Sequence, residues 1–111
     1  MSLYIGLMSG TSMDGVDAAL ARIDAQGIAT LGASFLGFPA TLKSELMALQ
    51  AAVSDEIARE ALAANALAQV YADCVRQLLE QTGHGATEIR AIAVHGQTIR
   101  HRPELGYTRQ T

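Results

Sequence analysis

The feature that most constrains the fold is a long helical pattern between stretches of strand-like sequence. The pattern begins at Ser54-Asp55-Glu56, whose acidic residues suit the positive end of a helix dipole, and ends at Gly83, a residue typical of helix termination. Apolar and semi-apolar residues recur along it at helical spacing: Ile57, Leu67, Tyr71, Cys74 and Leu78. At 1.5 Å per residue the predicted helix is about 40 Å long, enough to connect two parallel strands.

Three strand-like stretches precede this helix. Leu3 to Met8 is a nearly continuous apolar run, the pattern of a strand covered on both faces. Residues 16–24 and 28–38 are separated by the turn Ala25-Gln26-Gly27, and the short connections predict antiparallel neighbours. The alanine-rich stretch 16–24 is also compatible with the start of a helix.

A shorter helix is predicted after Pro39, with Thr41 as a possible cap. Its apolar stripe consists of Leu42, Leu46, Leu49 and Val53. A fourth strand, Ile89 to Val94, follows the long helix and should lie parallel to the first strand. The expected fold is therefore α/β: three antiparallel strands, two helices and a parallel fourth strand, in one domain over residues 1–111 with no internal boundary.

Composition narrows the functional classes. Half of the 111 residues are apolar, and 8 basic against 11 acidic residues give a net charge of −3, without a basic stripe for nucleic acid or anionic membranes. No apolar run is long enough to span a bilayer, so the cytoplasm is the expected location. Cys74 stands alone in an apolar helical pattern and is expected in the core. The histidines His84, His95 and His101 lack zinc-site spacing.

The first strand breaks into GLMSGTSMDGVDAAL, residues 6–20. Gly10, Ser12 and Gly15 belong to a turn whose amides and hydroxyls suit phosphate oxygens, because glycine lets a ligand approach the backbone. The turn lacks the lysine of a P-loop and leads into a strand. Residue types alone equally allow an ordinary hairpin turn centred on Asp14-Gly15. Asp14 is the better candidate for a water-mediated Mg²⁺ contact, and Asp17 is as readily structural.

The fourth strand breaks into HGQTIRHRPE. Its polar side chains suit a sugar or a phosphate, although a solvated loop is an open alternative. They are His95, Gln97, Thr98, Arg100 and His101. If the first and fourth strands are parallel, both polar segments lie at the same sheet edge, where open α/β sheets bind ligands.

Together, IGLMSGTSMDGVDAAL (5–20) and AIAVHGQTIRHRP (91–103) resemble the amino-terminal part of anhydro-N-acetylmuramic acid kinases. The resemblance implies a ribonuclease H-like domain of the actin-like ATPase and sugar kinase superfamily. These enzymes recycle cell-wall sugar: they open the 1,6-anhydro bond with water and transfer the γ-phosphate of ATP to O6, which gives N-acetylmuramate 6-phosphate. The expected cofactors are ATP and Mg²⁺, and the expected partners are small molecules.

The resemblance also implies residue roles. The ATP phosphate-binding segment would comprise Gly10, Thr11, Ser12, Met13, Asp14, Gly15, Val16 and Asp17, with Asp14 holding Mg²⁺ through water. The sugar cleft would be lined by His95, Gly96, Gln97 and Thr98. Tyr107, Thr108 and Gln110 match the next strand of the family.

The catalytic base and second lobe are expected beyond Thr111, so we expect a truncated and inactive chain that self-associates through an exposed apolar edge. The alternative is a non-catalytic half-domain that binds phosphate or assembles with another chain.

Overall fold

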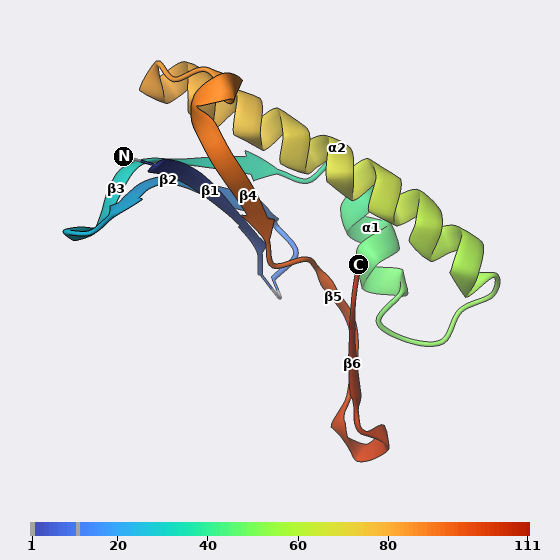
Figure 1. Ribbon diagram of the computed structural model, residues 1–111. Coiled ribbons are helices and arrows are strands. Elements are labelled where there is room, and N and C mark those ends of the chain that lie inside the picture. The colour runs from blue at the N-terminus through green and yellow to red at the C-terminus, as the bar shows by residue number, and fades with distance from the viewer. Residues whose placement is uncertain (1, 11) are drawn as a thin grey trace.

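The computed structural model describes residues 2–10 and 12–111 and contains a four-stranded mixed sheet (Figure 1). Its strands are β1 (Ser2–Ser9), β2 (Gly15–Asp24), β3 (Gly27–Gly37) and β4 (Ile89–Val94), in the order β3-β2-β1-β4. β1 pairs antiparallel with β2 and parallel with β4, and β2 pairs antiparallel with β3. The predicted strand order and directions are confirmed, and residues 16–24 are strand.

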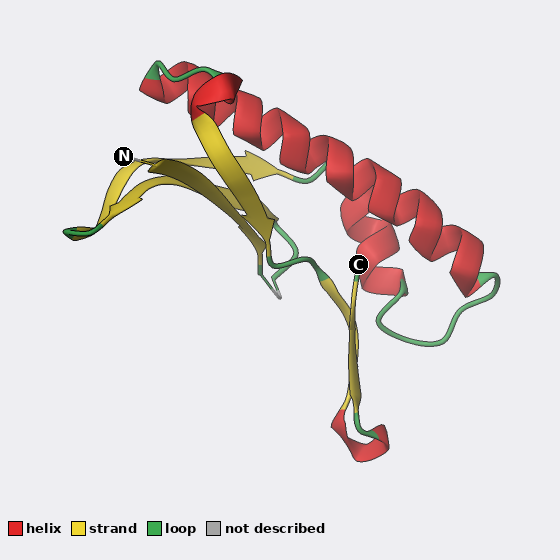
Figure 2. Ribbon diagram, in the orientation of Figure 1, coloured by secondary structure: helices red, strands yellow, loops and turns green. Residues whose placement is uncertain are grey.

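Two helices lie on one side of the sheet (Figure 2). α1 spans Ala40–Ala48 and α2 spans Glu56–Thr82, and a short 3-10 turn, η1 (Ala86–Glu88), leads into β4. Gly83 ends α2 in a left-handed conformation with φ 73°, as predicted. Thr41 is not a cap, because α1 already begins at Ala40 after Pro39 and has no side-chain cap. Val53 lies beyond the end of α1 but still packs against the core.

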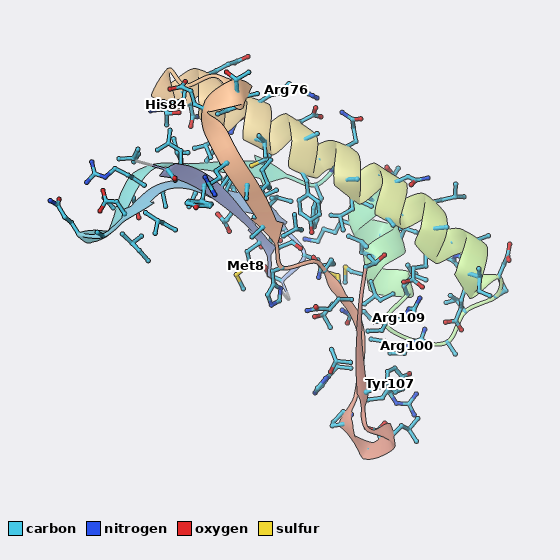
Figure 3. The ribbon with its side chains drawn as sticks, in the orientation of Figure 1. Met8, Arg76, His84, Arg100, Tyr107 and Arg109 are labelled. Atoms are coloured by element: carbon cyan, nitrogen blue, oxygen red, sulfur yellow. The ribbon has the colours of Figure 1, made fainter. Side chains whose placement is uncertain are left out.

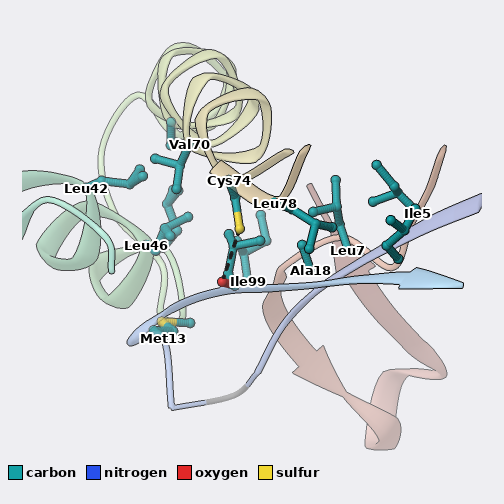
Figure 4. Packing of buried hydrophobic residues seen from close by; sticks show 14 of the residues in the cluster. Ile5, Leu7, Met13, Ala18, Leu42, Leu46, Val70, Cys74, Leu78 and Ile99 are labelled. Atoms are coloured by element: carbon teal, nitrogen blue, oxygen red, sulfur yellow. Dashed lines mark hydrogen bonds between the residues drawn. The ribbon is translucent and has the colours of Figure 1, made fainter. Parts of the chain in front are cut away.

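The core fills the space between the helices and the sheet (Figure 4). α2 contributes Val70, Cys74 and Leu78, while α1 contributes Leu42 and Leu46. Cys74 is fully buried, and its Sγ lies 3.7 Å from the Val16 carbonyl oxygen. The expectation that Cys74 is a core residue is confirmed. Ile57, in contrast, is 88% exposed, so the buried stripe of α2 does not extend to its first turn.

The sheet is covered on one face only. Along β1, Leu3, Ile5 and Leu7 are buried, whereas Gly6 and Met8 are exposed. The prediction that β1 is covered on both faces is therefore wrong for this structure. Its apolar residues alternate between the core and a face that no described element covers.

Beyond β4, the chain forms a hairpin that projects away from the sheet (Figure 3). It comprises β5 (Thr98–Arg102), a 3-10 turn η2 (Pro103–Leu105) and β6 (Tyr107–Gln110). Arg109 pairs with Glu60 of α2 at 3.0 Å, and Arg100 reaches the α1–α2 connection. Residues 98–102 are therefore a paired strand, not a solvated loop. No helix in the described part of the chain is long and apolar enough to cross a membrane.

Candidate functional site

The turn between β1 and β2 is tight and anchored in the core. The Met13 amide donates to the Gly10 carbonyl at 3.1 Å. Met13 has φ 56°, a left-handed conformation, and its side chain is 1% exposed as a member of the hydrophobic core (Figure 4). Burial of Met13 leaves the neighbouring Ser12 and Asp14 exposed. Thr11, predicted to bind phosphate, lies outside the described residues.

Asp14 connects the turn to α1. Its backbone carbonyl accepts a hydrogen bond from the Phe38 amide at 3.0 Å, and its Oδ1 accepts one from Lys43 Nζ, also at 3.0 Å. Lys43 and, to a smaller extent, Ser12 hold the pKa of the Asp14 carboxyl below its usual value. The Asp14 side chain remains 62% exposed, so the carboxylate is ionised and accessible at neutral pH.

Gly15 and Val16 are buried and belong to β2. A Cβ at Gly15 would meet the Leu36 carbonyl oxygen, and it would lie 2.7 Å from the Phe35 ring. The close approach of β3 is thus sufficient to require glycine at position 15. Since Gly15 pairs with Gly37 and the positive φ is at Met13, Asp14-Gly15 is not the centre of a two-residue hairpin turn.

The His-Gly-Gln-Thr segment meets this turn directly. Gln97 Nε2 donates to the Gly10 carbonyl at 3.3 Å, and Ser9 Oγ donates to the Gly96 carbonyl at the same distance. The His95 amide donates to the Leu7 carbonyl at 3.0 Å, which extends the β1–β4 contact to the ends of both strands. The two polar segments predicted to share one sheet edge are therefore in contact.

The four residues of this segment have different surroundings. Gln97 is fully buried, and its Oε1 has no hydrogen-bond partner among the described residues. Gly96 has φ 87°, a conformation that favours glycine. The Thr98 hydroxyl accepts a hydrogen bond from Gln110, and His95 is exposed. Of the four, His95 presents its side chain most openly.

Two residues proposed with this segment lie away from the turn. The His101 ring is 2.6 Å from the Thr108 hydroxyl within the hairpin. Arg100 donates to the carbonyls of Leu49 and Ala51 at 2.9 and 2.7 Å and pairs with Glu56 at 2.8 Å. Both side chains stabilise the hairpin and its junction with the helices.

A shallow hollow of about 610 Å³ lies beside the two polar segments, on the sheet face that the helices leave uncovered. Asp17 and His95 supply its polar groups. Small side chains form much of its floor, and its lining residues are Gly6, Leu7, Met8, Asp17, Ala18, Ala19, Ala33, Ala93, Val94 and His95. Asp17 therefore faces this hollow, whereas Asp14 is directed towards α1.

No group of three or more histidine, cysteine, aspartate or glutamate side chains forms a metal cage within residues 2–10 and 12–111. Mg²⁺ that accompanies a nucleotide needs only one or two carboxylates, because phosphate oxygens and water complete its shell. The accessible Asp14 carboxylate fits that requirement. The residues therefore suit Mg²⁺ only as part of a metal–phosphate complex.

Lys43 and Ser9 contribute to the site, although sequence reasoning assigned them no role. Lys43 is separated from Asp14 by 29 positions and lies in α1, and a lysine in a helix at the protein surface is usually solvated. One signal was available: Lys43 is the single lysine of the chain.

Ligands of open α/β sheets bind beyond the carboxyl ends of parallel strands. The chain is an α/β protein with a mixed sheet, and the polar segments after β1 and β4 form a candidate ligand site at that edge. The chain belongs to the anhydro-N-acetylmuramic acid kinase family, whose sequence model matches residues 2–111.

Three relatives illustrate the similarity. An anhydro-N-acetylmuramic acid kinase of Burkholderia pseudomallei is 57% identical over 109 residues, which cover 97% of this chain and 28% of the relative. The protein of the same name from Burkholderia thailandensis is 55% identical over 109 residues, with the same coverage. That from Bordetella pertussis is 55% identical over 108 residues, 97% of this chain and 29% of the relative. The chain thus spans less than a third of the curated relatives it matches.

Proposed function

We propose that these 111 residues are the amino-terminal portion of an ATP-dependent sugar kinase that acts on anhydro-N-acetylmuramic acid. The observation that carries the proposal is the hydrogen bond from Gln97 to the Gly10 carbonyl, which joins the two family segments into one site. Phosphoryl transfer requires the phosphates and the acceptor sugar to be held side by side. Two ligand-binding segments in direct contact provide that arrangement.

In this proposal the turn from Gly10 to Asp17 binds the ATP phosphates. Ser12 contributes an exposed hydroxyl, and backbone amides contribute dipoles that need no reorganisation during the reaction. Asp14 holds Mg²⁺ through water, and the ion would neutralise charge on the transferred phosphoryl group. The side chains of Met13 and Val16 are buried, so these residues shape the turn, and Gly15 would reach the nucleotide only through its backbone.

The sugar is proposed to bind beside the His95–Thr98 segment. His95 is the exposed donor and acceptor of that segment, and it borders the same hollow as Asp17. The buried Gln97 does not contact the sugar; it holds the turn in place through its hydrogen bond to the Gly10 carbonyl. The product would be N-acetylmuramate 6-phosphate, formed during cell-wall recycling in the cytoplasm, where ATP is available.

We further propose that the domain is part of a ribonuclease H-like, actin-like ATPase fold. The three antiparallel strands followed by a parallel fourth strand support this assignment. The general base for the attacking water is proposed to belong to the part of the family that these 111 residues do not span.

A polypeptide of these 111 residues alone should therefore bind nucleotide without turnover. An ADP-release assay with ATP, Mg²⁺ and the anhydro sugar tests this expectation, and turnover above the buffer rate would contradict it. Calorimetry with ATP tests the binding site itself, because Asp14→Ala should weaken any measured affinity.

The edge strand β4 favours a second candidate function, a self-assembling half-domain. Ile92 and Val94 on this edge are 50% and 49% exposed, and an unpaired strand edge is a template for association. Light scattering would test it: Ile92→Lys should reduce a concentration-dependent increase in mass, whereas Arg90→Lys on the same strand should not. A monomeric wild-type chain at all concentrations would exclude this candidate.

A further inference from the structure

We propose that Lys43 is a phosphate-binding residue of this site, supplying from α1 the cation that the turn itself lacks. The inference rests on the proposed nucleotide function and deepens it. Its starting observation is the 3.0 Å contact between Lys43 Nζ and Asp14 Oδ1, which brings the single side-chain amine of the chain to the turn.

A cation at this position would offset the negative charge of the turn. The turn and the start of β2 carry two exposed carboxylates, Asp14 and Asp17, and ATP brings several further negative charges. Among the ion pairs of the described residues, Lys43 is the cation that reaches this turn. Without it, a polyanion would approach a net negative surface, which opposes binding.

The Lys43–Asp14 pair is suited to exchange of partners. Both side chains are substantially exposed, at 42% for Lys43 and 62% for Asp14, and exposed ion pairs are only weakly stabilising. A phosphate offers Lys43 a more highly charged acceptor than one carboxylate does. Asp14, once released, is free to hold the water shell of Mg²⁺.

The backbone holds the ammonium group close to the turn. The Lys43 amide donates to the Pro39 carbonyl at 3.0 Å in the first turn of α1, and the Phe38 amide donates to the Asp14 carbonyl. Both contacts are made by the backbone, so they do not depend on which group the Lys43 side chain contacts. This geometry gives α1 a role in ligand binding in addition to its packing against the core.

Calorimetric titration of the 111-residue chain with ATP and Mg²⁺ tests the proposal. Lys43→Gln should weaken ATP binding by about tenfold or more, because one charge-assisted hydrogen bond is lost. Lys43→Arg should retain most of the affinity. Arg90→Gln is the matched control: it removes one positive charge from the opposite end of the sheet, where β4 begins beside Leu3, and should leave the affinity unchanged.

A titration with inorganic triphosphate in metal-free buffer separates direct contact from an effect through Asp14. Asp14→Asn breaks the same ion pair but keeps the lysine, so it should bind triphosphate at least as well as wild type, whereas Lys43→Gln should bind it more weakly. If both variants lost triphosphate affinity equally, a direct contact between Lys43 and phosphate would be excluded.

Chemical protection provides a second measurement that does not depend on a variant. ATP with Mg²⁺ should slow acylation of the Lys43 amine, measured by peptide mass spectrometry, and sodium chloride of equal ionic strength should slow it much less. If wild type binds ATP but Lys43→Gln behaves like Arg90→Gln, the role of Lys43 is refuted and the proposed function stands. If wild type does not bind ATP, both proposals fail for this chain.

Discussion

Gln97 Nε2 lies 3.3 Å from the carbonyl oxygen of Gly10, a residue 87 positions earlier in the chain. Gln97 is fully buried, whereas Gly10 is partly exposed, so this hydrogen bond lies at the edge of the core. Gln97→Leu should lower the free energy of unfolding by about 1 kcal/mol, because the Gly10 carbonyl loses one of its two donors and keeps only the Met13 amide. Urea denaturation measures the change. Gln110→Leu, on the exposed strand β6, is the control and should have a much smaller effect.

Gly15→Ala should be among the most damaging small substitutions in the sheet. The added methyl group would lie 2.8 Å from the Gly37 Cα and against the Leu36 carbonyl, so β2 and β3 would have to separate locally. We expect a loss of about 3 kcal/mol in unfolding free energy. Gly6→Ala, where a Cβ meets nothing within 4 Å, is the matched control in β1. Comparable melting curves for the two variants would contradict this account.

The Asp14 carboxyl should titrate below its usual range in the folded chain because Lys43 stabilises its charged form. A lowered folded pKa contributes stability above the unfolded value of about 4, and the contribution is lost as the pH falls through the folded value. The stability difference between wild type and Asp14→Asn should thus shrink below about pH 4. Carbon NMR of the carboxyl group gives the pKa directly. Lys43→Gln should raise that pKa towards the usual value, and an unchanged value would contradict the assigned cause.

Arg100 should hold the β5–β6 hairpin in its folded position. Its guanidinium is mostly buried, with 16% of the side chain exposed, and it bridges two carbonyls after α1 and the Glu56 carboxylate. Arg100→Ala should remove hydrogen-exchange protection from the amides of β5 and β6 and cost about 2 kcal/mol. Arg102→Ala, which loses only an exposed pair with Glu104, should preserve that protection.

The Cys74 thiol should be inert towards thiol reagents in the folded chain. It is fully buried, and desolvation raises the pKa of the thiol. Its rate of modification should therefore follow the unfolded fraction along a urea titration. Rapid stoichiometric modification in native buffer would show that the core opens around α2.

The sheet was predictable because its signals are local. Short connections make the first three strands antiparallel to their neighbours, and the helical crossover before Ile89 makes β4 parallel to β1. Gly83 marks where the crossover helix ends. The exposed position of Ile57 and the open face beside Met8 were not predictable, because burial depends on which elements cover a face. The apolar pattern of one element does not show whether another element packs against it.

The site was predictable to the level of its two segments but not of its contacts. Turn-forming residues identify Gly10 to Gly15 as a turn, yet the core anchor at Met13 depends on α1. The Lys43 contact depends on how α1 sits against the turn, which no sequence spacing encodes. Strand β5 was obscured by its polar residues, whose partners are supplied by β6 and the α1–α2 connection.

Met13 is at once a turn residue and a core residue, with 1% of its surface exposed. The native conformation of the turn therefore depends on the core, and we expect the unfolded chain to lack an equivalent anion site. Any anion that the turn binds must accordingly act as a thermodynamic ligand of the native state and raise the melting temperature with its concentration. Folding and any anion binding at this turn are therefore linked equilibria.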